Sequence, residues 1–152
     1  MPSRSLSDLD SRLFPLAQQH EDLCEASGVR LLIYETYRSP AEQRSYYAQG
    51  RLPLDTVNSM RAEVGLPPIT AAANMKCVTW NRFSRHNITA TDGTPAAQAY
   101  DACPLDDKGH MDWDTKGLAW AIVVEAGKRI GLEWGGDFPR FDGPHWQLKV
   151  LA

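Results

Sequence analysis

Apolar residues recur at helical spacing in two stretches of the chain. The first stretch predicts an N-terminal helix that is started or kinked by Pro15 and ends at Gly28. Its apolar positions are Leu6, Leu9, Leu13, Leu16, Ala17 and Leu23. The second stretch predicts a helix over residues 115–130, which Gly131 caps at its C-terminus. Its apolar positions are Leu118, Ala119, Ile122, Val123, Ala126 and Ile130.

A third pattern predicts a strand that is followed directly by a helix. Residues 29–36 form an apolar run that is typical of a buried strand. Ser39 can cap a helix over residues 40–49, and Glu42 can complete a capping box. Arg38 therefore lies at a strand-to-helix corner, where a rigid scaffold presents a side chain well.

The remaining segments are shorter and less regular. Residues 55–64 predict a short helix, residues 87–98 an exposed loop, and residues 145–150 a short strand. No internal repeat or low-complexity linker divides the chain. Helices alternating with a few short strands predict an α+β fold, with helices on a small antiparallel sheet, in one domain over residues 1–152.

Composition and charge narrow the possible partners. The 152 residues are 43% hydrophobic and 23% charged, which suits one globular domain with a sizeable core. The net charge of −3 argues against a dominant nucleic-acid surface. The N-terminus lacks the apolar core of a signal peptide, and the longest apolar stretch, residues 118–124, is too short to span a bilayer. We expect a protein made in a cytoplasm, with no nucleic-acid partner and no membrane anchor.

The three cysteines give no sign of a disulfide framework. Cys24, Cys77 and Cys103 are odd in number and widely spaced, which also argues against a Cys-x-x-Cys zinc site. We expect structural thiols, with a place near a metal left open for Cys103 because Asp101 is so close in sequence.

Two of the four histidines have plausible carboxylate partners. His86 follows Ser84-Arg85, and His145 ends the string Asp142-Gly143-Pro144-His145. With Asp101, these histidines can fill three of the four positions around a zinc ion, and a catalytic site keeps the fourth open for water. Asp142 would then accept a proton from that water. Spacing alone leaves the alternative of two unrelated loop histidines.

The other two histidines are weaker candidates. His20 lies among polar residues, and we expect it on the exposed face of the first helix. His110 follows Lys108-Gly109 in a predicted turn.

Several motifs in this order resemble one family of zinc peptidases, which includes phage L-alanyl-D-glutamate endolysins and bacterial D-alanyl-D-alanine carboxypeptidases and dipeptidases. The matching motifs are Tyr37-Arg38-Ser39-x-x-x-Gln43, Tyr47-Ala48-Gln49-Gly50-Arg51, Val78-Thr79, Ser84-x-His86-Asn87, Ala99-x-Asp101, Trp134-Gly135-Gly136-Asp137-Phe138 and Asp142-x-Pro144-His145-Trp146. The resemblance covers residues 29–148. The second and the last motif are most similar to the endolysin branch.

The resemblance implies a hedgehog/DD-peptidase-like fold and a role for each matching residue. His86, Asp101 and His145 would be the zinc ligands, Asp142 the general base, and Arg38 the group that stabilises the oxyanion. The residues expected to touch substrate or support the ligands are Ser84, Gln43 and Trp134.

This chain departs from the family pattern at one point. Asp101 lies fifteen residues after His86, where the family has seven. We interpret residues 88–97 as containing an inserted loop, which leaves Asp92 as the competing ligand. Glu133 is the competing base, although the family base lies three residues before the last histidine.

The function implied by the resemblance is that of a zinc-dependent peptidoglycan endopeptidase, an endolysin that cleaves the L-alanyl–D-glutamate bond of the stem peptide. The alternatives are a D-alanyl-D-alanine carboxypeptidase and a zinc-binding module without catalysis. We expect a monomer in the cytoplasm of a phage host, which reaches the wall after another protein releases it.

Overall fold

The computed structural model describes residues 1–149, which form four α-helices and one four-stranded sheet. The strands are β1 (Leu31–Glu35), β2 (Ala99–Pro104), β3 (Glu133–Trp134) and β4 (His145–Gln147). Their order across the sheet is β1-β2-β4-β3, and every neighbouring pair is antiparallel. The predicted α+β fold is therefore confirmed.

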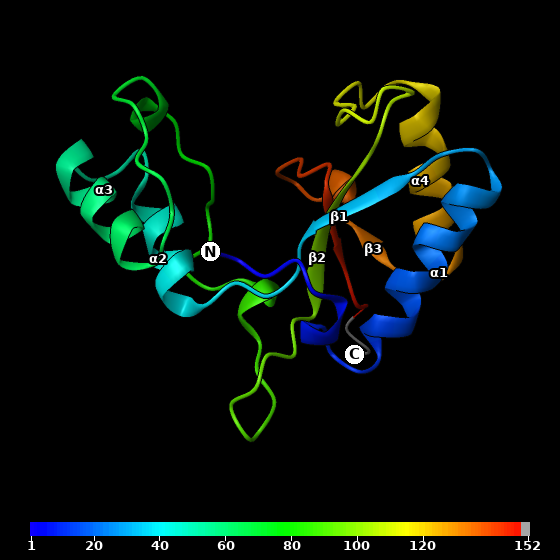
Figure 1. Ribbon diagram of the computed structural model, residues 1–152, viewed down its shortest axis with the longest axis horizontal. Coiled ribbons are helices and arrows are strands. Elements are labelled where there is room, and N and C mark those ends of the chain that lie inside the picture. The colour runs from blue at the N-terminus through cyan, green and yellow to red at the C-terminus, as the bar shows by residue number, and fades with distance from the viewer. Residues whose placement is uncertain (150–152) are drawn as a thin grey trace.

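Two helices, α1 (Leu13–Ala26) and α4 (Leu118–Arg129), lie together on one face of the sheet (Figure 1). Buried residues of both helices pack against side chains of β1, β2 and β4. The fully buried members of this core are Leu13, Ala17, Cys24, Ala97, Tyr100, Ala102, Val123 and Trp146. No helix in residues 1–149 combines the length and the apolar character that a bilayer crossing requires.

The other two helices, α2 (Pro40–Ala48) and α3 (Leu54–Glu63), form a separate pair away from that core (Figure 1). The N-terminal segment joins this pair to the sheet. The backbone of Ser3 exchanges hydrogen bonds with Thr36 and Tyr37, and the Met1 ammonium lies 3.2 Å from the buried Glu42 carboxylate. The segment between the sheet and the helix pair is therefore fixed at both ends.

Local sequence explains where these helices begin and end. The Ser39 hydroxyl accepts from the Glu42 amide, and the Glu42 carboxylate accepts from the Ser39 amide, so the predicted capping box is confirmed. Gly131 has a φ of 88° directly beyond α4, the left-handed conformation that favours glycine after a helix.

Three predicted elements differ from the structure. The first apolar run divides into η1 (Leu6–Asp8) and α1. Helix α1 begins only two residues before Pro15, so the proline lies in the first turn of the helix, where the backbone amides have no partner within the helix and a proline is tolerated. The predicted strand over residues 145–150 is shorter, since β4 ends at Gln147 and residue 150 lies outside the described residues. The loop over residues 87–98 is exposed for most of its length, but Ala97 is buried and bridges to Leu9.

The prediction of an exposed His20 is wrong. Its side chain is fully buried at the junction of α1, β2 and α4. His20 Nε2 lies 2.8 Å from the Val123 carbonyl oxygen, so this nitrogen donates, and Nδ1 accepts from the Tyr100 hydroxyl at 2.7 Å. Burial is possible because both ring nitrogens have partners.

Candidate metal centre

Strand register places three polar side chains in one row across the sheet. Asp101 of β2 pairs with Glu35 of β1 on one side and with His145 of β4 on the other. A bulge in β1 follows Ile33, which pairs with Ala102. The bulge moves Glu35 onto the face that carries Asp101, because one extra residue reverses the alternation of side chains.

His86 approaches this row from η3 (Arg85–Asn87). The Ser84 hydroxyl accepts from the His86 amide at 3.2 Å, and the Asn87 side chain accepts from the Ser84 amide at 2.7 Å. This tight turn carries the histidine to the end of the strands. Ser84 thus helps to hold the turn that carries His86.

One potential ligand atom from each of His86, Asp101 and His145 lies within 4.8 Å of the others. Asp101 Oδ1 lies 3.3 Å from His86 Nε2 and 3.6 Å from His145 Nδ1. Ligand atoms of a tetrahedral zinc site are separated by roughly 3.4 Å, given Zn–N and Zn–O bonds of about 2.1 Å. The three side chains fit such a site.

The tautomer of His86 is fixed by the backbone. Its Nδ1 lies 2.7 Å from the Thr36 carbonyl oxygen, which only accepts, so Nδ1 carries the proton. In the neutral ring Nε2 is then unprotonated, and it is buried without a hydrogen-bond partner. A buried lone pair without a donor is costly, and a metal ion would satisfy it.

The tautomer of His145 is fixed by two further side chains. Gln147 donates from Nε2 to Glu133 Oε2 at 2.8 Å, so its Oε1 faces His145 Nε2, also at 2.8 Å. His145 Nε2 therefore donates, and Nδ1 is the free lone pair beside Asp101. Gln147 and Glu133 hold the ring as outer partners commonly hold a metal-binding histidine.

The electrostatics of the cluster favour a cation. Burial opposes the ionisation of Asp101, but when the imidazole nitrogens that face it are protonated, the charge of His86 and hydrogen bonding from His145 and His86 outweigh burial and hold the Asp101 pKa far below its usual range. Burial alone would lower the His145 pKa, yet Asp101 raises it. The same carboxylate that attracts a proton here would attract a metal ion.

Asp142 lies at the rim of this cluster. Its side chain is 54% exposed, and Oδ2 lies 3.9 Å from His145 Nδ1. Partial burial, together with the charge of Asp101, raises the Asp142 pKa. A Cβ atom on Gly135 would lie only 2.2 Å from the Asp142 carbonyl oxygen, so the loop that carries Asp142 can approach only a glycine there.

Arg38 is held in place at the other side of Asp101. Its Nε and Nη2 contact Glu35 Oε1 at 2.5 Å, and Nη1 donates to Gln43 Oε1 at 2.7 Å. Nη2 lies 3.8 Å from Asp101 Oδ2, and the Arg38 amide donates to the His86 carbonyl at 3.0 Å. A guanidinium group has five N–H donors, so Arg38 retains donors beyond these contacts.

Gln43 and Trp134 support the site indirectly, through Arg38 and the loop that carries Asp142. Gln43 is fully buried and donates to the Asn81 carbonyl at 2.7 Å while it accepts from Arg38. Trp134 donates from its indole nitrogen to the Gly143 carbonyl at 2.7 Å and stacks on Trp146. The two side chains fix Arg38 and the Asp142 loop respectively.

The competing candidates lie elsewhere. Asp92 is exposed and accepts hydrogen bonds from the Thr94 amide and hydroxyl. His110 is exposed near Asp106. The Cys103 thiol is buried and donates to the Asp112 carbonyl, and burial raises its pKa to about 11. None of the three is in the cluster that the described residues form.

Two residues of the site were missed from the sequence. Glu35 lies three residues before Arg38, a spacing that could have indicated an ion pair. The face of the sheet on which the Glu35 side chain lies, however, depends on the bulge in β1. Gln147 lies two residues after His145, so strand alternation places both on one face.

Comparison with known proteins identifies the family. Residues 78–148 match the family described as D-alanyl-D-alanine carboxypeptidase. The chain is also 32% identical over 150 residues to the peptidoglycan L-alanyl-D-glutamate endopeptidase CwlK of Bacillus subtilis (strain 168), across 91% of this chain and 74% of that protein. The chain belongs to this peptidase family. The resemblance inferred from the motifs is confirmed, and the matched segment contains His86, Asp101, Asp142 and His145.

Proposed function

We propose that the chain is a zinc-dependent peptidase that hydrolyses the L-alanyl–D-glutamate bond in the stem peptide of bacterial peptidoglycan. The observation that carries the proposal is the cluster of His86 Nε2, His145 Nδ1 and Asp101 Oδ1, in which hydrogen bonds on the far nitrogens leave both imidazole lone pairs free. The 32% identity to the endopeptidase CwlK supports this choice of bond.

Each residue around the cluster has a role in this hydrolysis. His86, Asp101 and His145 would hold zinc, which supplies Lewis-acid chemistry by polarising a carbonyl and lowering the pKa of water. Asp142 accepts a proton from the attacking water and delivers it to the leaving amine. Arg38 donates to the oxygen on which negative charge develops.

The rigidity of Arg38 supports its role. Its side chain is held by Glu35 and Gln43 before any substrate binds, so little reorganisation is needed during the reaction. Removal of one such donor in comparable oxyanion sites costs about 3–4 kcal/mol of transition-state stabilisation.

A second candidate function is removal of the terminal D-alanine from the stem. The matched family description, D-alanyl-D-alanine carboxypeptidase, favours it, and the same side chains would serve both reactions. A zinc-binding module without catalysis is less well supported, because such a module requires neither Asp142 nor the constrained Arg38.

Product analysis separates the two reactions. We expect purified peptidoglycan treated with the protein to gain new N-terminal D-glutamate amines, detected by labelling and mass spectrometry. Release of free D-alanine without new D-glutamate amines would assign the carboxypeptidase reaction instead. Loss of turbidity in permeabilised cells would support the lytic part of the proposal, since cleavage within stems breaks cross-links whereas trimming of their ends does not.

Asp142→Asn separates the base from the ligands. We expect this variant to retain one zinc ion per chain, measured by elemental analysis, and to lose at least about a hundredfold in kcat because the proton acceptor is gone. Asp92→Asn is the matched control, since Asp92 is an exposed carboxylate outside the cluster, and it should keep both metal and activity. Near-normal turnover of Asp142→Asn would exclude Asp142 as the base.

A further inference from the structure

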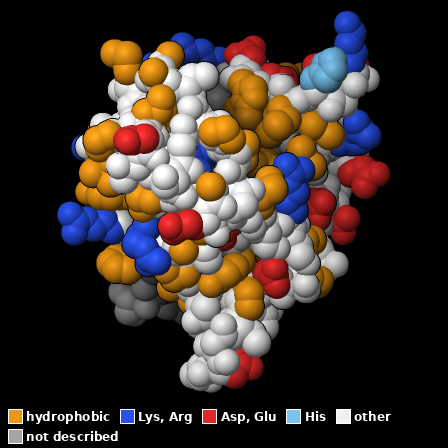
Figure 2. Space-filling view, turned by 60° about the vertical axis from the view of Figure 1, so that its left-hand side comes forward, with side chains coloured by type: hydrophobic (Ala, Val, Ile, Leu, Met, Phe, Trp, Pro, Cys, Tyr) orange, Lys and Arg blue, Asp and Glu red, His pale blue; other side chains and the backbone are white. Residues whose placement is uncertain are grey.

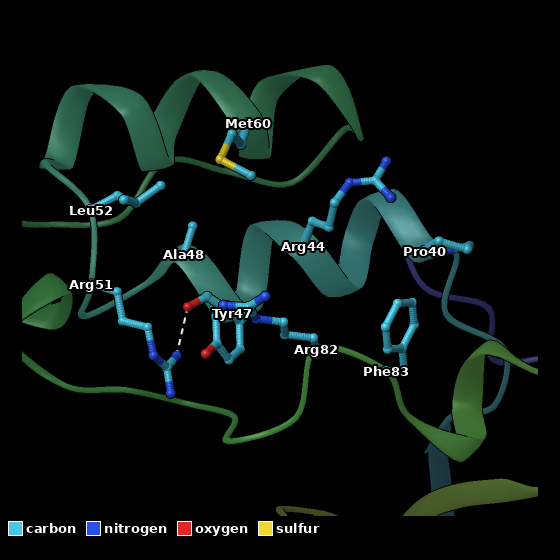
Figure 3. Close-up of a pocket in the computed structure, with 9 residues that line it drawn as sticks. All are labelled: Pro40, Arg44, Tyr47, Ala48, Arg51, Leu52, Met60, Arg82 and Phe83. Carbon is cyan, nitrogen blue, oxygen red and sulfur yellow. Dashed lines mark hydrogen bonds between the residues drawn. The ribbon is translucent and has the colours of Figure 1, made fainter.

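A hollow of about 490 Å³ lies beside α2, outside the metal cluster. Figure 3 shows Met60 of α3 on one side of α2, and Arg82 and Phe83 of the later loop on the other. Its lining residues are Pro40, Arg44, Tyr47, Ala48, Arg51, Leu52, Met60, Arg82 and Phe83. The lining therefore combines apolar and aromatic side chains with three arginines and no carboxylate.

The three arginines carry positive charge that the protein does not neutralise. Arg44, Arg51 and Arg82 take part in none of the ion pairs among residues 1–149. The whole chain has a net charge of −3, so this concentration is local. Figure 2 brings this side of the molecule forward and shows hydrophobic side chains gathered on it, with basic side chains beside them.

The arginines differ in what they can offer a ligand. Arg51 donates to the carbonyl groups of Tyr47 and Thr79 and stacks on the Tyr47 ring at 3.9 Å, so it fixes the hollow's wall. Arg44 is exposed on α2, and no hydrogen bond of its side chain is found in the described part of the chain. Arg82 is also exposed and lies 5.4 Å from the Tyr47 ring. Arg44 and Arg82 are therefore the groups available to an anion.

Helix α2 and the loop before His86 border the hollow and also lead to the metal centre. Pro40 is two residues from Arg38, and Phe83 is three residues from His86. Gln43 of α2 bonds both Arg38 and the Asn81 carbonyl, which ties the loop before Phe83 to the site. The residues that line the hollow are therefore held by the same two segments that carry Arg38 and His86.

We propose that this hollow binds the carboxylate-bearing part of an acidic peptide whose scissile bond lies at the metal cluster. The inference rests on the proposed function and adds a subsite to it. Arg44 and Arg82 bind the carboxylate, for which guanidinium groups are well suited. Met60, Phe83 and Leu52 cover the apolar parts of the same segment.

The test measures binding without turnover. Isothermal titration of the full-length Asp142→Asn protein uses the peptide L-alanyl-γ-D-glutamyl-L-lysine and the same peptide with its carboxylates converted to amides. Arg44→Gln and Arg82→Gln should each weaken binding of the acidic peptide by about tenfold, the effect of one charge-assisted hydrogen bond. Neither change should alter the weaker binding of the amidated peptide.

Arg129→Gln is the matched control. Arg129 is an exposed arginine of α4, on the opposite side of the sheet, and its loss changes the net charge equally. The control should bind both peptides as the parent does. In the active protein, Arg44→Gln and Arg82→Gln should raise KM and leave kcat unchanged.

The outcomes separate this inference from the proposed function. Three results would overturn the subsite. They are an equal loss of affinity for the acidic and the amidated peptide, an unchanged affinity in an Arg44→Gln/Arg82→Gln double variant, and no binding of the acidic peptide. Hydrolysis of peptidoglycan by the unchanged protein is measured separately, so the proposed reaction can stand while the subsite fails. Charge-dependent binding without hydrolysis would retain the subsite and overturn the reaction.

Discussion

At the scale of single residues, hydrogen bonds on the far side of each imidazole decide which nitrogen faces the cluster. The Thr36 carbonyl does this for His86, and the Gln147 side chain does it for His145. A substitution cannot remove the backbone carbonyl of Thr36, whereas it can remove the side-chain carbonyl of Gln147. The two histidines therefore differ in how easily their orientation can be tested.

Gln147→Leu should weaken zinc binding by about 10–100-fold, the usual effect of losing an outer partner of a metal-binding histidine. The substitution removes the acceptor of the His145 Nε2 proton and leaves that donor without a partner. Competition with a chelator measures the affinity. Gln19→Leu, at an exposed position of α1, is the control and should bind zinc normally. Equal affinities in the two variants would show that Gln147 does not position the ring.

The residues of the cluster could be proposed from the sequence where the family's motifs contain them. His86, His145, Asp101 and Asp142 all lie in motifs that resemble the family's, and the structure brings them close together. The outer partners could not be predicted in this way. The position of Glu35 depends on a bulge in β1, which the apolar pattern of residues 29–36 does not indicate.

At the scale of elements, segments with a sustained apolar pattern or a clear cap could be predicted, whereas the shortest strand could not. Helix α4 and the capped start of α2 follow from periodicity and cap chemistry. Strand β3 has two residues, too few for any alternation to be recognised, and β4 has three, half of the strand predicted over residues 145–150. β4 is fixed by pairing with β2, and β3 by pairing with β4 and packing against α4.

The contact between α4 and β4 depends on Gly127. A Cβ atom there would lie 2.3 Å from Trp146 Cζ3, and both the helix and the buried indole are fixed. Gly127→Ala should therefore lower the free energy of unfolding by roughly 2 kcal/mol, despite the higher helix propensity of alanine. Urea unfolding measures the change. Glu125→Ala, on the exposed side of the same helix, should stay within about 0.5 kcal/mol of the parent protein.

At the scale of the whole molecule, the buried core and the metal cluster occupy opposite faces of one small sheet. Tyr100 and Trp146 face α1 and α4, while their neighbours Asp101 and His145 face the cluster. Packing on one face thus fixes the register that the other face requires. His20 is central to that packing, since its ring contacts Tyr100, the Val123 carbonyl and the edge of Trp146.

The burial of His20 should make stability depend on pH. Burial lowers the pKa of His20 to about 4, from about 6.5 in an unfolded chain, and the groups around its ring carry no charge at neutral pH. As the pH falls through 6.5, the unfolded chain binds a proton that the folded protein does not. Stability is then lost until the pH reaches about 4, and the loss between pH 7 and pH 5 should be about 2 kcal/mol.

His20→Gln tests this dependence, because glutamine can donate to the Val123 carbonyl and does not titrate in that range. We expect the variant to be less stable than the parent at pH 7, since the fit to Tyr100 and Trp146 is lost. Its urea midpoint should fall less than that of the parent between pH 7 and pH 5. The other titrating groups are common to both proteins and cancel in the comparison. The same loss of stability in both proteins would mean that protonation of His20 does not control acid unfolding.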